Sequence, residues 1–600
     1  MSVLETPRIY FRGEMAWDPI TTNNYCANYD ENTGQSILPA AVNQVAAFRQ
    51  QAIGDVTNIG NWNPHGTHRS KLFNTAICGF DLGGGLKTDD PFVTACANFS
   101  GMLVDLEPYG SISSQLFFDA LQFGLDGGYR ILAPRTSRVT ARYINFGRNS
   151  ANTMIAGVAS VVWTTSFAKA DGLRVDAFDS PALQALAKAM EAADVEGLTV
   201  QINAYRTVYY DNPNLSNGSK AAQAAAQALT DKLNSGGFQP NPARSLLVGV
   251  IGLWRKGEPA HEPGGRALVL APGNSPLGGA HCRVDGDALT LDFSNSVPEI
   301  DKDLTKQDLG TLSVGYVDAS SQKFTSLASF GYDRYNKTAY EASAGIIVLP
   351  VTGGAAKDAA DRDLEIRQAD GTVLLSEIAA RAIPAAPNQY LDEGETTTLA
   401  FDVYKRGVRV GAGVPLTLYQ MNSSGAGSLH PIAAKTDANG VAVVPLPSML
   451  SPITAMVPSF STVDQPTGGI DTQVNTYMYI RIRPSGAATA QLQPTWDNVY
   501  AYVLANWNAL APCMDNWLRL DDPVQVRAYA ALLKRLTDPA QFESFLFMPV
   551  TRDMTAGERS LLWKFLDGAK VEPAPQAAAH RDGMRNPAAM SRAMRRPVRS

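Results

Sequence analysis

The 600-residue sequence predicts a multidomain, β-rich α+β protein with a large mixed β domain, an immunoglobulin-like β-sandwich and a C-terminal helical subdomain. The chain is longer than one hydrophobic core supports, so we expect several domains. Its 50 Gly and 36 Pro, with only 18% charged residues, make a loop-rich, charge-poor composition that favours β structure. Apolar residues alternate in short runs along most of the chain and recur at helical spacing near its end.

Residues 1–345 are expected to form a β-rich N-terminal domain with helical insertions. Strands are predicted at 8–12, 155–165, 198–202 and 246–254, where β-branched or alternating apolar residues gather. The last run is apolar throughout, apart from two glycines, which is typical of a strand buried on both faces.

Two helices are expected to interrupt these strands. The first begins at Ser180 and Pro181, because serine caps a helix and proline suits its first turn, and apolar residues follow at spacings of three and four. The second, over 220–233, is rich in alanine but poor in large apolar residues, so we place it on the surface.

Residues 346–387 are interpreted as a connecting segment, and 388–482 as an immunoglobulin-like β-sandwich. Within the sandwich, alternating strands flank a turn at Asn439-Gly440, where a positive φ angle costs little. The strands are expected at 395–404, 413–419 and 441–444.

Residues 493–568 are predicted to form the helical subdomain. Thr555 and Glu558 have the spacing of a capping box, and Leu561, Leu562 and Phe565 form the apolar stripe behind it. Residues 571–600 hold six arginines and two acidic residues without apolar periodicity, so we expect a disordered basic tail.

Charge and cysteine content exclude several classes of function. The net charge is −6 and no basic face is evident, so neither nucleic acid nor a membrane is an expected partner. The five cysteines are widely spaced without a CxxC pair, which indicates free thiols in a reducing compartment. With no signal-peptide pattern at the N-terminus, we expect a cytoplasmic protein.

Five short segments, occurring in one order along the chain, carry a resemblance to a known family. They are 7–13 (PRIYFRG), 197–201 (GLTVQ), 248–258 (VGVIGLWRKGE), 265–268 (GRAL) and 548–554 (MPVTRDM). Together they resemble the violacein- and rebeccamycin-type iminophenylpyruvate (chromopyrrolate) dimer synthases, which couple two indole-pyruvate imines. The match spans nearly all of residues 1–568, discontinuously.

The resemblance implies a role in secondary metabolite biosynthesis. In that family a ferritin-like helical domain follows the matching region, and haem is associated with the enzymes. We expect the present chain to lack that domain, since 493–600 contains no Glu-x-x-His pair for a di-iron bundle.

The chain is therefore interpreted as a stand-alone counterpart of the N-terminal module. Its expected partner is a separately encoded ferritin-like or haem protein, and a homo-oligomer is a further option. The residues themselves predict no cofactor, and haem enters through the resemblance alone. Whether the chain is an enzyme stays open, and the alternative is a non-catalytic scaffold that binds other proteins.

The sequence offers two candidate ligand-binding groups, and no catalytic residue is assigned. His65 and His68, with Asn63 beside them, could hold a ligand, but they lie in a Gly/Pro/Asn loop, and we favour a structural role. No metal site is predicted. Arg8 and Arg12 could bind a substrate carboxylate bidentately, as an indole-pyruvate would require, although such arginines more often pair with nearby acids such as Glu14 or Asp18.

Nucleophilic catalysis finds no support in the sequence. There is no GxSxG motif around any serine. Cys282 directly follows His281, but adjacent residues of a strand point to opposite faces, so these two are not expected to act together.

Overall fold

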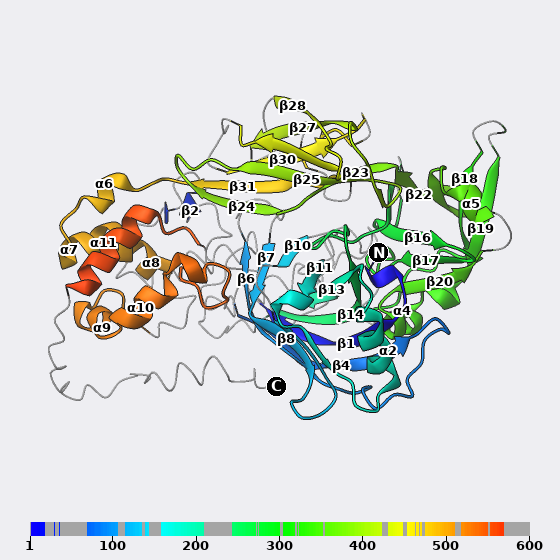
Figure 1. The fold of residues 1–600 in the computed structure, drawn as a ribbon, viewed down its shortest axis with the longest axis horizontal. Helices are drawn as coiled ribbons and strands as arrows, with labels where there is room; N and C mark the ends of the chain where they lie inside the picture. The colour runs from blue at the N-terminus through cyan, green and yellow to red at the C-terminus, as the bar shows by residue number, and fades with distance from the viewer. Residues whose placement is uncertain are drawn as a thin grey trace, which may run out of the picture.

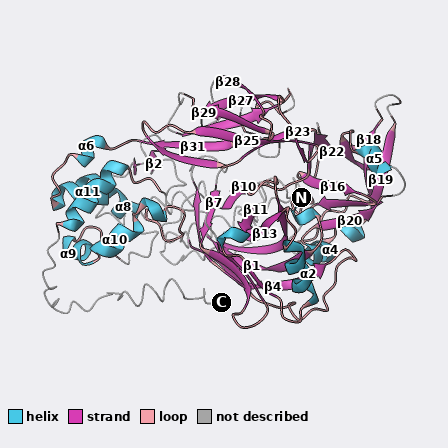
Figure 2. Ribbon diagram, viewed as in Figure 1, coloured by secondary structure: helices cyan, strands magenta, loops and turns pink. Residues whose placement is uncertain are grey.

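A computed structural model confirms the β-rich, multidomain architecture (Figures 1 and 2). Strands fill most of the molecule, and the C-terminal helices gather at one end (Figure 2). The structure describes residues 2–17, 29–30, 35–36, 69–105, 114–134, 139–142, 158–208, 243–271, 273, 275–300, 304–318, 321, 323–351, 355–422, 430–447, 453–461, 464–466, 469–470, 474–510, 518–549 and 552–568.

The N-terminal part is a closed antiparallel barrel of eight strands in the order β1-β14-β13-β11-β10-β7-β6-β4. All four strands predicted from the sequence belong to it. The barrel strands are β1 (Arg8–Trp17), β4 (Arg69–Asp81), β6 (Ser100–Asp105), β7 (Ser114–Phe118), β10 (Val139–Arg142), β11 (Val158–Ala168), β13 (Val195–Val208) and β14 (Ala243–Arg255).

A four-stranded sheet and one helix share the hydrophobic core of the barrel. The helix α2 (Pro181–Met190) begins as predicted, because the Ser180 hydroxyl accepts a hydrogen bond from the Leu183 N–H at 3.1 Å. The Asp90 carboxylate in turn accepts from the Ser180 hydroxyl at 2.6 Å. The helix predicted at 220–233 lies outside the described residues. The sheet consists of β12 (Arg174–Asp176), β9 (Arg130–Pro134), β8 (Ala120–Gly124) and β5 (Ala97–Asn98).

An eight-stranded antiparallel sheet follows, in the order β19-β18-β21-β22-β15-β16-β17-β20. Here the structure differs from the connecting segment expected at 346–387. Leu364, Ile366 and Leu375 are fully buried in the core of this sheet, so these residues form strands rather than a linker. The strands are β15 (Arg266–Leu270), β16 (Ala280–Asp285), β17 (Ala288–Asp292), β18 (Leu312–Val317), β19 (Phe324–Phe330), β20 (Ile346–Pro350), β21 (Leu364–Gln368) and β22 (Val373–Ile378).

Strand β14 is buried on both faces, as its sequence predicts. Leu247 and Ile251 point into the barrel core, whereas Val248 and Val250 pack outside it. Their neighbours outside include Tyr340 in helix α4 (Lys337–Ser343). The barrel therefore packs against the second sheet through one continuous apolar contact.

The next unit is a two-sheet sandwich whose strands include those predicted for the immunoglobulin-like module. The Asp437 carboxylate accepts from the Asn439 and Val441 N–H groups at 2.8 and 2.9 Å, and Gly440 takes the expected positive φ of 72°. The strands are β23 (Ala380–Pro384), β24 (Asn388–Asp392), β25 (Thr398–Lys405), β26 (Val408–Arg409), β27 (Pro415–Asn422), β28 (His430–Lys435), β29 (Val441–Pro445), β30 (Ile453–Ser459) and β31 (Met478–Arg483).

The C-terminal helices enclose their own apolar cluster. The predicted capping box is present, since the Thr555 hydroxyl accepts from the Glu558 N–H at 3.2 Å and the Glu558 carboxylate accepts from the Thr555 N–H at 2.7 Å. The tail at 571–600 lies outside the described residues. The helices are α6 (Ala487–Ala490), α7 (Trp496–Val499), α8 (Ala505–Leu510), α9 (Pro523–Ala528), α10 (Ala530–Leu536) and α11 (Ala556–Asp567). Within the part of the chain that is described, no helix has the length and apolarity needed to cross a membrane.

Candidate functional site

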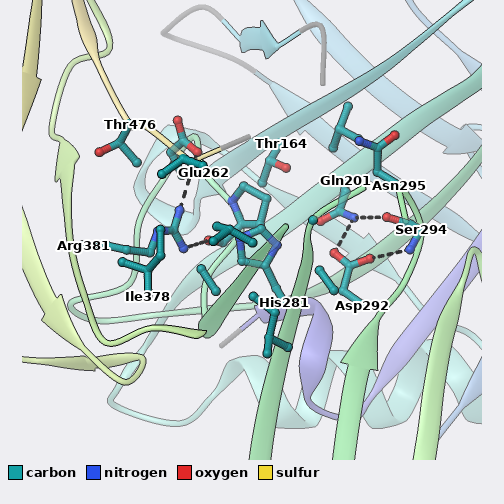
Figure 3. A pocket seen from close by; sticks show the side chains of 18 of the residues that line it. Thr164, Gln201, Glu262, His281, Asp292, Ser294, Asn295, Ile378, Arg381 and Thr476 are labelled. Atoms are coloured by element: carbon teal, nitrogen blue, oxygen red, sulfur yellow. Dashed lines mark hydrogen bonds and ion pairs between the residues drawn. The ribbon is translucent and has the colours of Figure 1, made fainter. Parts of the chain in front are cut away.

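A polar cavity of about 80 Å³ lies where the barrel, the eight-stranded sheet and the sandwich meet (Figure 3). The barrel contributes Thr164 and Gln201, the eight-stranded sheet His281 and Asp292, and the sandwich Arg381. We call this cavity the junction pocket. Its lining comes from segments far apart in the chain, so the pocket exists only when the three units are packed together.

His281 and Asp292 stand directly opposite each other on the neighbouring strands β16 and β17. Opposed residues of antiparallel strands point to the same face of the sheet, with Cβ atoms about 5 Å apart. The two side chains therefore both face the pocket. Cys282 points the other way into the core of the sheet and is 0% exposed, as the strand geometry predicts.

Asp292 is held in place by buried hydrogen bonds (Figure 3). Its Oδ2 accepts from Gln201 Nε2 at 2.9 Å, and its Oδ1 accepts from the Ser294 N–H at 3.0 Å. Gln201 Nε2 also donates to the Ser294 hydroxyl at 3.1 Å. Burial raises the pKa of the Asp292 carboxyl, and the bonds from Ser294 and Gln201 only partly offset this. The pocket thus contains a fixed carboxyl group whose pKa lies above the ordinary value of an aspartate.

Two buried polar atoms of the lining have no hydrogen-bond partner among the described residues. They are Gln201 Oε1 and Thr164 Oγ1, and these two residues are 2% and 3% exposed. A buried acceptor without a partner is costly, so such atoms commonly bond to water or to a ligand.

The opposite wall carries a cationic group. Arg381 Nη1 donates to the Pro263 carbonyl at 3.4 Å, and Nη2 lies 4.0 Å from Glu262 Oε2 (Figure 3). His261 lines the same wall, with Nδ1 at 3.3 Å from the Thr165 hydroxyl. The pocket therefore combines a guanidinium, two imidazoles and the two buried carboxyl groups of Glu262 and Asp292, a set suited to a small ligand with both an acidic and a nitrogen-containing end.

Of the residues predicted as ligand-binding, Arg8 and Arg12 do not line this pocket. Arg8 is 2% exposed and pairs with Asp81, with Nη2 at 2.6 Å from Oδ2, so an acid other than those anticipated engages it. Arg12 lies exposed on the same strand, and neither arginine lines the pocket. Asn63, His65 and His68 lie outside the described residues, and their predicted role stays a prediction.

The pocket residues were missed because their proximity depends on three separate units. In the sequence, His281 stands out only as the neighbour of Cys282, and no functional role is predicted for either residue. One signal was available, since His281 stands between the apolar residues Ala280 and Cys282, a pattern that places a polar side chain on the second face of a strand. Asp292, between Leu291 and Phe293, and Arg381, between Ala380 and Ala382, show the same pattern, but nothing in the pattern brings the three residues together.

Among the described residues, the cysteines and potential metal ligands add no second site. Cys78, Cys96 and Cys282 are free thiols, and burial raises the pKa of Cys282 to about 12. Within the described ranges, no group of three or more His, Cys, Asp and Glu side chains is placed to hold a metal ion.

Sequence comparison relates the chain to an enzyme. It is 24% identical over 417 residues to the 2-imino-3-(indol-3-yl)propanoate dimerase of Chromobacterium violaceum, across 65% of this chain and 35% of that protein. The aligned part thus covers about a third of the length of the curated relative. No family model matches the chain.

Comparison with solved structures finds similar proteins among the macroglobulins. A trypsin-activated alpha-2-macroglobulin from Escherichia coli is 10% identical, with a TM-score of 0.13, over 47% of this chain and 15% of that one. A Salmonella alpha-2-macroglobulin variant gives the same identity and TM-score over 69% and 25% of the two chains.

Proposed function

We propose that this chain is the small-molecule-binding component of a biosynthetic route to an amino-acid-derived metabolite. In this proposal the junction pocket takes a 2-imino acid or the corresponding 2-oxo acid. The observation that carries the proposal is the convergence of Arg381, His281 and Asp292 on one cavity, in a chain related in sequence to an imine dimerase.

The lining atoms match the functional groups of such a ligand. A carboxylate would bind the guanidinium of Arg381, because charge-assisted hydrogen bonds to arginine are strong and directional. An imine N–H would donate to Gln201 Oε1, which lacks a partner among the described residues. In this proposal the cavity of about 80 Å³ holds the polar head of the ligand, and the side chain of the ligand extends out of it.

We further propose that the chain acts as a stand-alone counterpart of the module found in dimer synthases. A separately encoded ferritin-like or haem protein would then supply the oxidative chemistry. This part of the proposal draws on the resemblance in sequence. Co-expression of the chain with candidate oxidative proteins, followed by size-exclusion chromatography, would reveal a stable complex.

Isothermal titration calorimetry with indole-3-pyruvate tests the binding proposal. We expect the purified chain to bind this 2-oxo acid, and Arg381→Gln to weaken binding by about 10-fold or more, which corresponds to the loss of one charge-assisted hydrogen bond. The matched control is Arg519→Gln, since Arg519 is exposed on a distant segment and pairs with Asp521. Absence of binding by the wild-type chain, or equal binding by Arg381→Gln, would contradict the proposal.

One observation favours the alternative of a non-catalytic, protein-binding scaffold. The sandwich exposes Val408 and Val443, at 67% and 51%, on strands β26 and β29, which both pair with β25. If the chain is a scaffold, the double variant Val408→Lys with Val443→Lys should abolish complex formation with the oxidative protein, and indole-3-pyruvate should not bind the wild-type chain.

A further inference from the structure

We propose that the junction pocket catalyses a proton transfer, the interconversion of a 2-imino acid with its enamine tautomer. This inference deepens the proposed function and rests on it, because it assumes that a 2-imino or 2-oxo acid occupies the pocket. It adds an activity, with His281 as the base and Asp292 as the acid. Both are catalytic residues in this proposal, since both line the cavity that the ligand would fill.

The geometry places an acid and a base on one face of one sheet. His281 and Asp292 are opposed across β16 and β17, so their spacing is fixed by the backbone ladder. Asp292 is held further by Gln201 and the Ser294 N–H, both within 3.0 Å of its oxygens. A proton-transfer pair requires this kind of fixed placement, because an acid and a base that drift apart cannot act on one ligand.

The surroundings of the two groups differ. Burial raises the pKa of the Asp292 carboxyl, which favours its role as the proton donor. His281 is only partly buried, and a ring nitrogen of an imidazole can accept a proton.

The proposed step is balanced without an oxidant. A ring nitrogen of His281 removes a proton from C3 of the ligand, and the C–H electron pair becomes the C2–C3 double bond. The electrons of the C2–N π bond move to nitrogen, which takes a proton from the Asp292 carboxyl. Proton return from the His281 imidazolium to the Asp292 carboxylate restores the pair. Arg381 holds the ligand carboxylate throughout and keeps C3 directed towards His281.

The test uses hydrogen–deuterium exchange on the intact chain. Indole-3-pyruvate serves as the probe, because a 2-oxo acid loses its C3 proton by the same chemistry as the imine and resists hydrolysis. Proton NMR in D₂O follows the disappearance of the C3 signal. We expect exchange about 100-fold faster than in buffer alone, at the lower end of the usual gain from general acid–base catalysis.

The variants His281→Gln and Asp292→Asn should each remove most of this acceleration. The matched control is His430→Gln, since His430 is exposed at the start of β28, remote from the pocket. Circular dichroism confirms folding, and His281→Ala provides a second variant at the partly exposed position.

Calorimetry on the same samples separates the possible failures. If the wild-type chain binds indole-3-pyruvate but exchange stays at the buffer rate, the proton-transfer inference is overturned and the proposed binding function stands. If the chain does not bind the probe, both proposals fall. Exchange that persists in both His281→Gln and Asp292→Asn would place the activity elsewhere and overturn the assignment.

Discussion

Arg481 and Asp553 form a buried ion pair between the sandwich and the helical end of the molecule, with Nη1 at 2.9 Å from Oδ1. Their side chains are 4% and 0% exposed. The adjacent Arg552 places its guanidinium 3.4 Å from the ring centroid of Phe117 on barrel strand β7. It also donates to the Ser544 carbonyl at 3.0 Å. Arg552 and Asp553, which belong to the segment 548–554 of the family resemblance, therefore join three structural units.

Removing one partner of this ion pair should destabilise the chain strongly. Asp553→Ala leaves the Arg481 charge buried without its partner, which typically costs about 3–5 kcal/mol. We expect a clear fall in the first thermal transition measured by differential scanning fluorimetry. Asp567→Ala is the matched control, because Asp567 pairs with Lys534 on the surface and is 64% exposed.

The double variant Arg481→Met with Asp553→Leu sharpens this prediction. Replacing both charges by apolar side chains removes the buried charge altogether, so stability should largely return. A double variant as unstable as Asp553→Ala would show that other contacts of Asp553 matter more than the ion pair.

Local signals in the sequence predicted much of the fold. The serine cap of α2, the Asp437–Gly440 turn and the Thr555–Glu558 capping box each depend on residues within a few positions of one another. For the same reason the apolar run of β14 revealed a strand with two buried faces.

Features that depend on distant pairing were not predictable in the same way. Strands β21 and β22 pair at their outer edges with β18 and β15, which come much earlier in the chain, so their place in a sheet depends on distant residues. The junction pocket depends on the packing of three units, and no local pattern links Gln201, Asp292 and Arg381. The arginines near the N-terminus looked more suitable for a carboxylate, but Arg8 is already engaged by Asp81.

Gly249 is predicted to be essential for packing inside the barrel. A Cβ atom at this position would lie 2.1 Å from the ring of Phe11, on the neighbouring strand β1. Gly249→Ala should therefore cost about 1–3 kcal/mol, the usual penalty for overpacking a core. The comparison is Gly84→Ala, where nothing lies within 4 Å of the added methyl group. Equal urea midpoints for the two variants would contradict the observed packing.

The cysteines should differ sharply in reactivity. Cys282 is 0% exposed, and burial raises its thiol pKa to about 12, so very little thiolate forms at neutral pH. Cys96 is exposed on the surface. Brief treatment with iodoacetamide at pH 8, followed by peptide mass spectrometry, should show Cys96 modified and Cys282 unmodified until urea is added. Rapid labelling of Cys282 in the native chain would mean that the core of the eight-stranded sheet opens readily.

Asp292 should reduce the stability of the chain at neutral pH. Burial raises the pKa of its carboxyl in the folded state above the unfolded value of about 3.9. Its contribution to stability is therefore fully present below about pH 3.9 and is lost as pH rises through the folded-state pKa, because the folded state binds the proton more tightly.

Asp292→Asn removes this titration and keeps an oxygen for the Ser294 N–H, while the Gln201 amide can rotate to offer Oε1 to the new side-chain NH₂ group. The melting temperature of Asp292→Asn relative to wild type should accordingly rise as the pH is raised above about 3.9, whereas Asp285→Asn, at a residue whose side chain is 69% exposed, should show no such trend. A difference that shrinks as pH rises would mean that Asp292 is stabilised as a carboxylate, and it could then not donate a proton in the junction pocket.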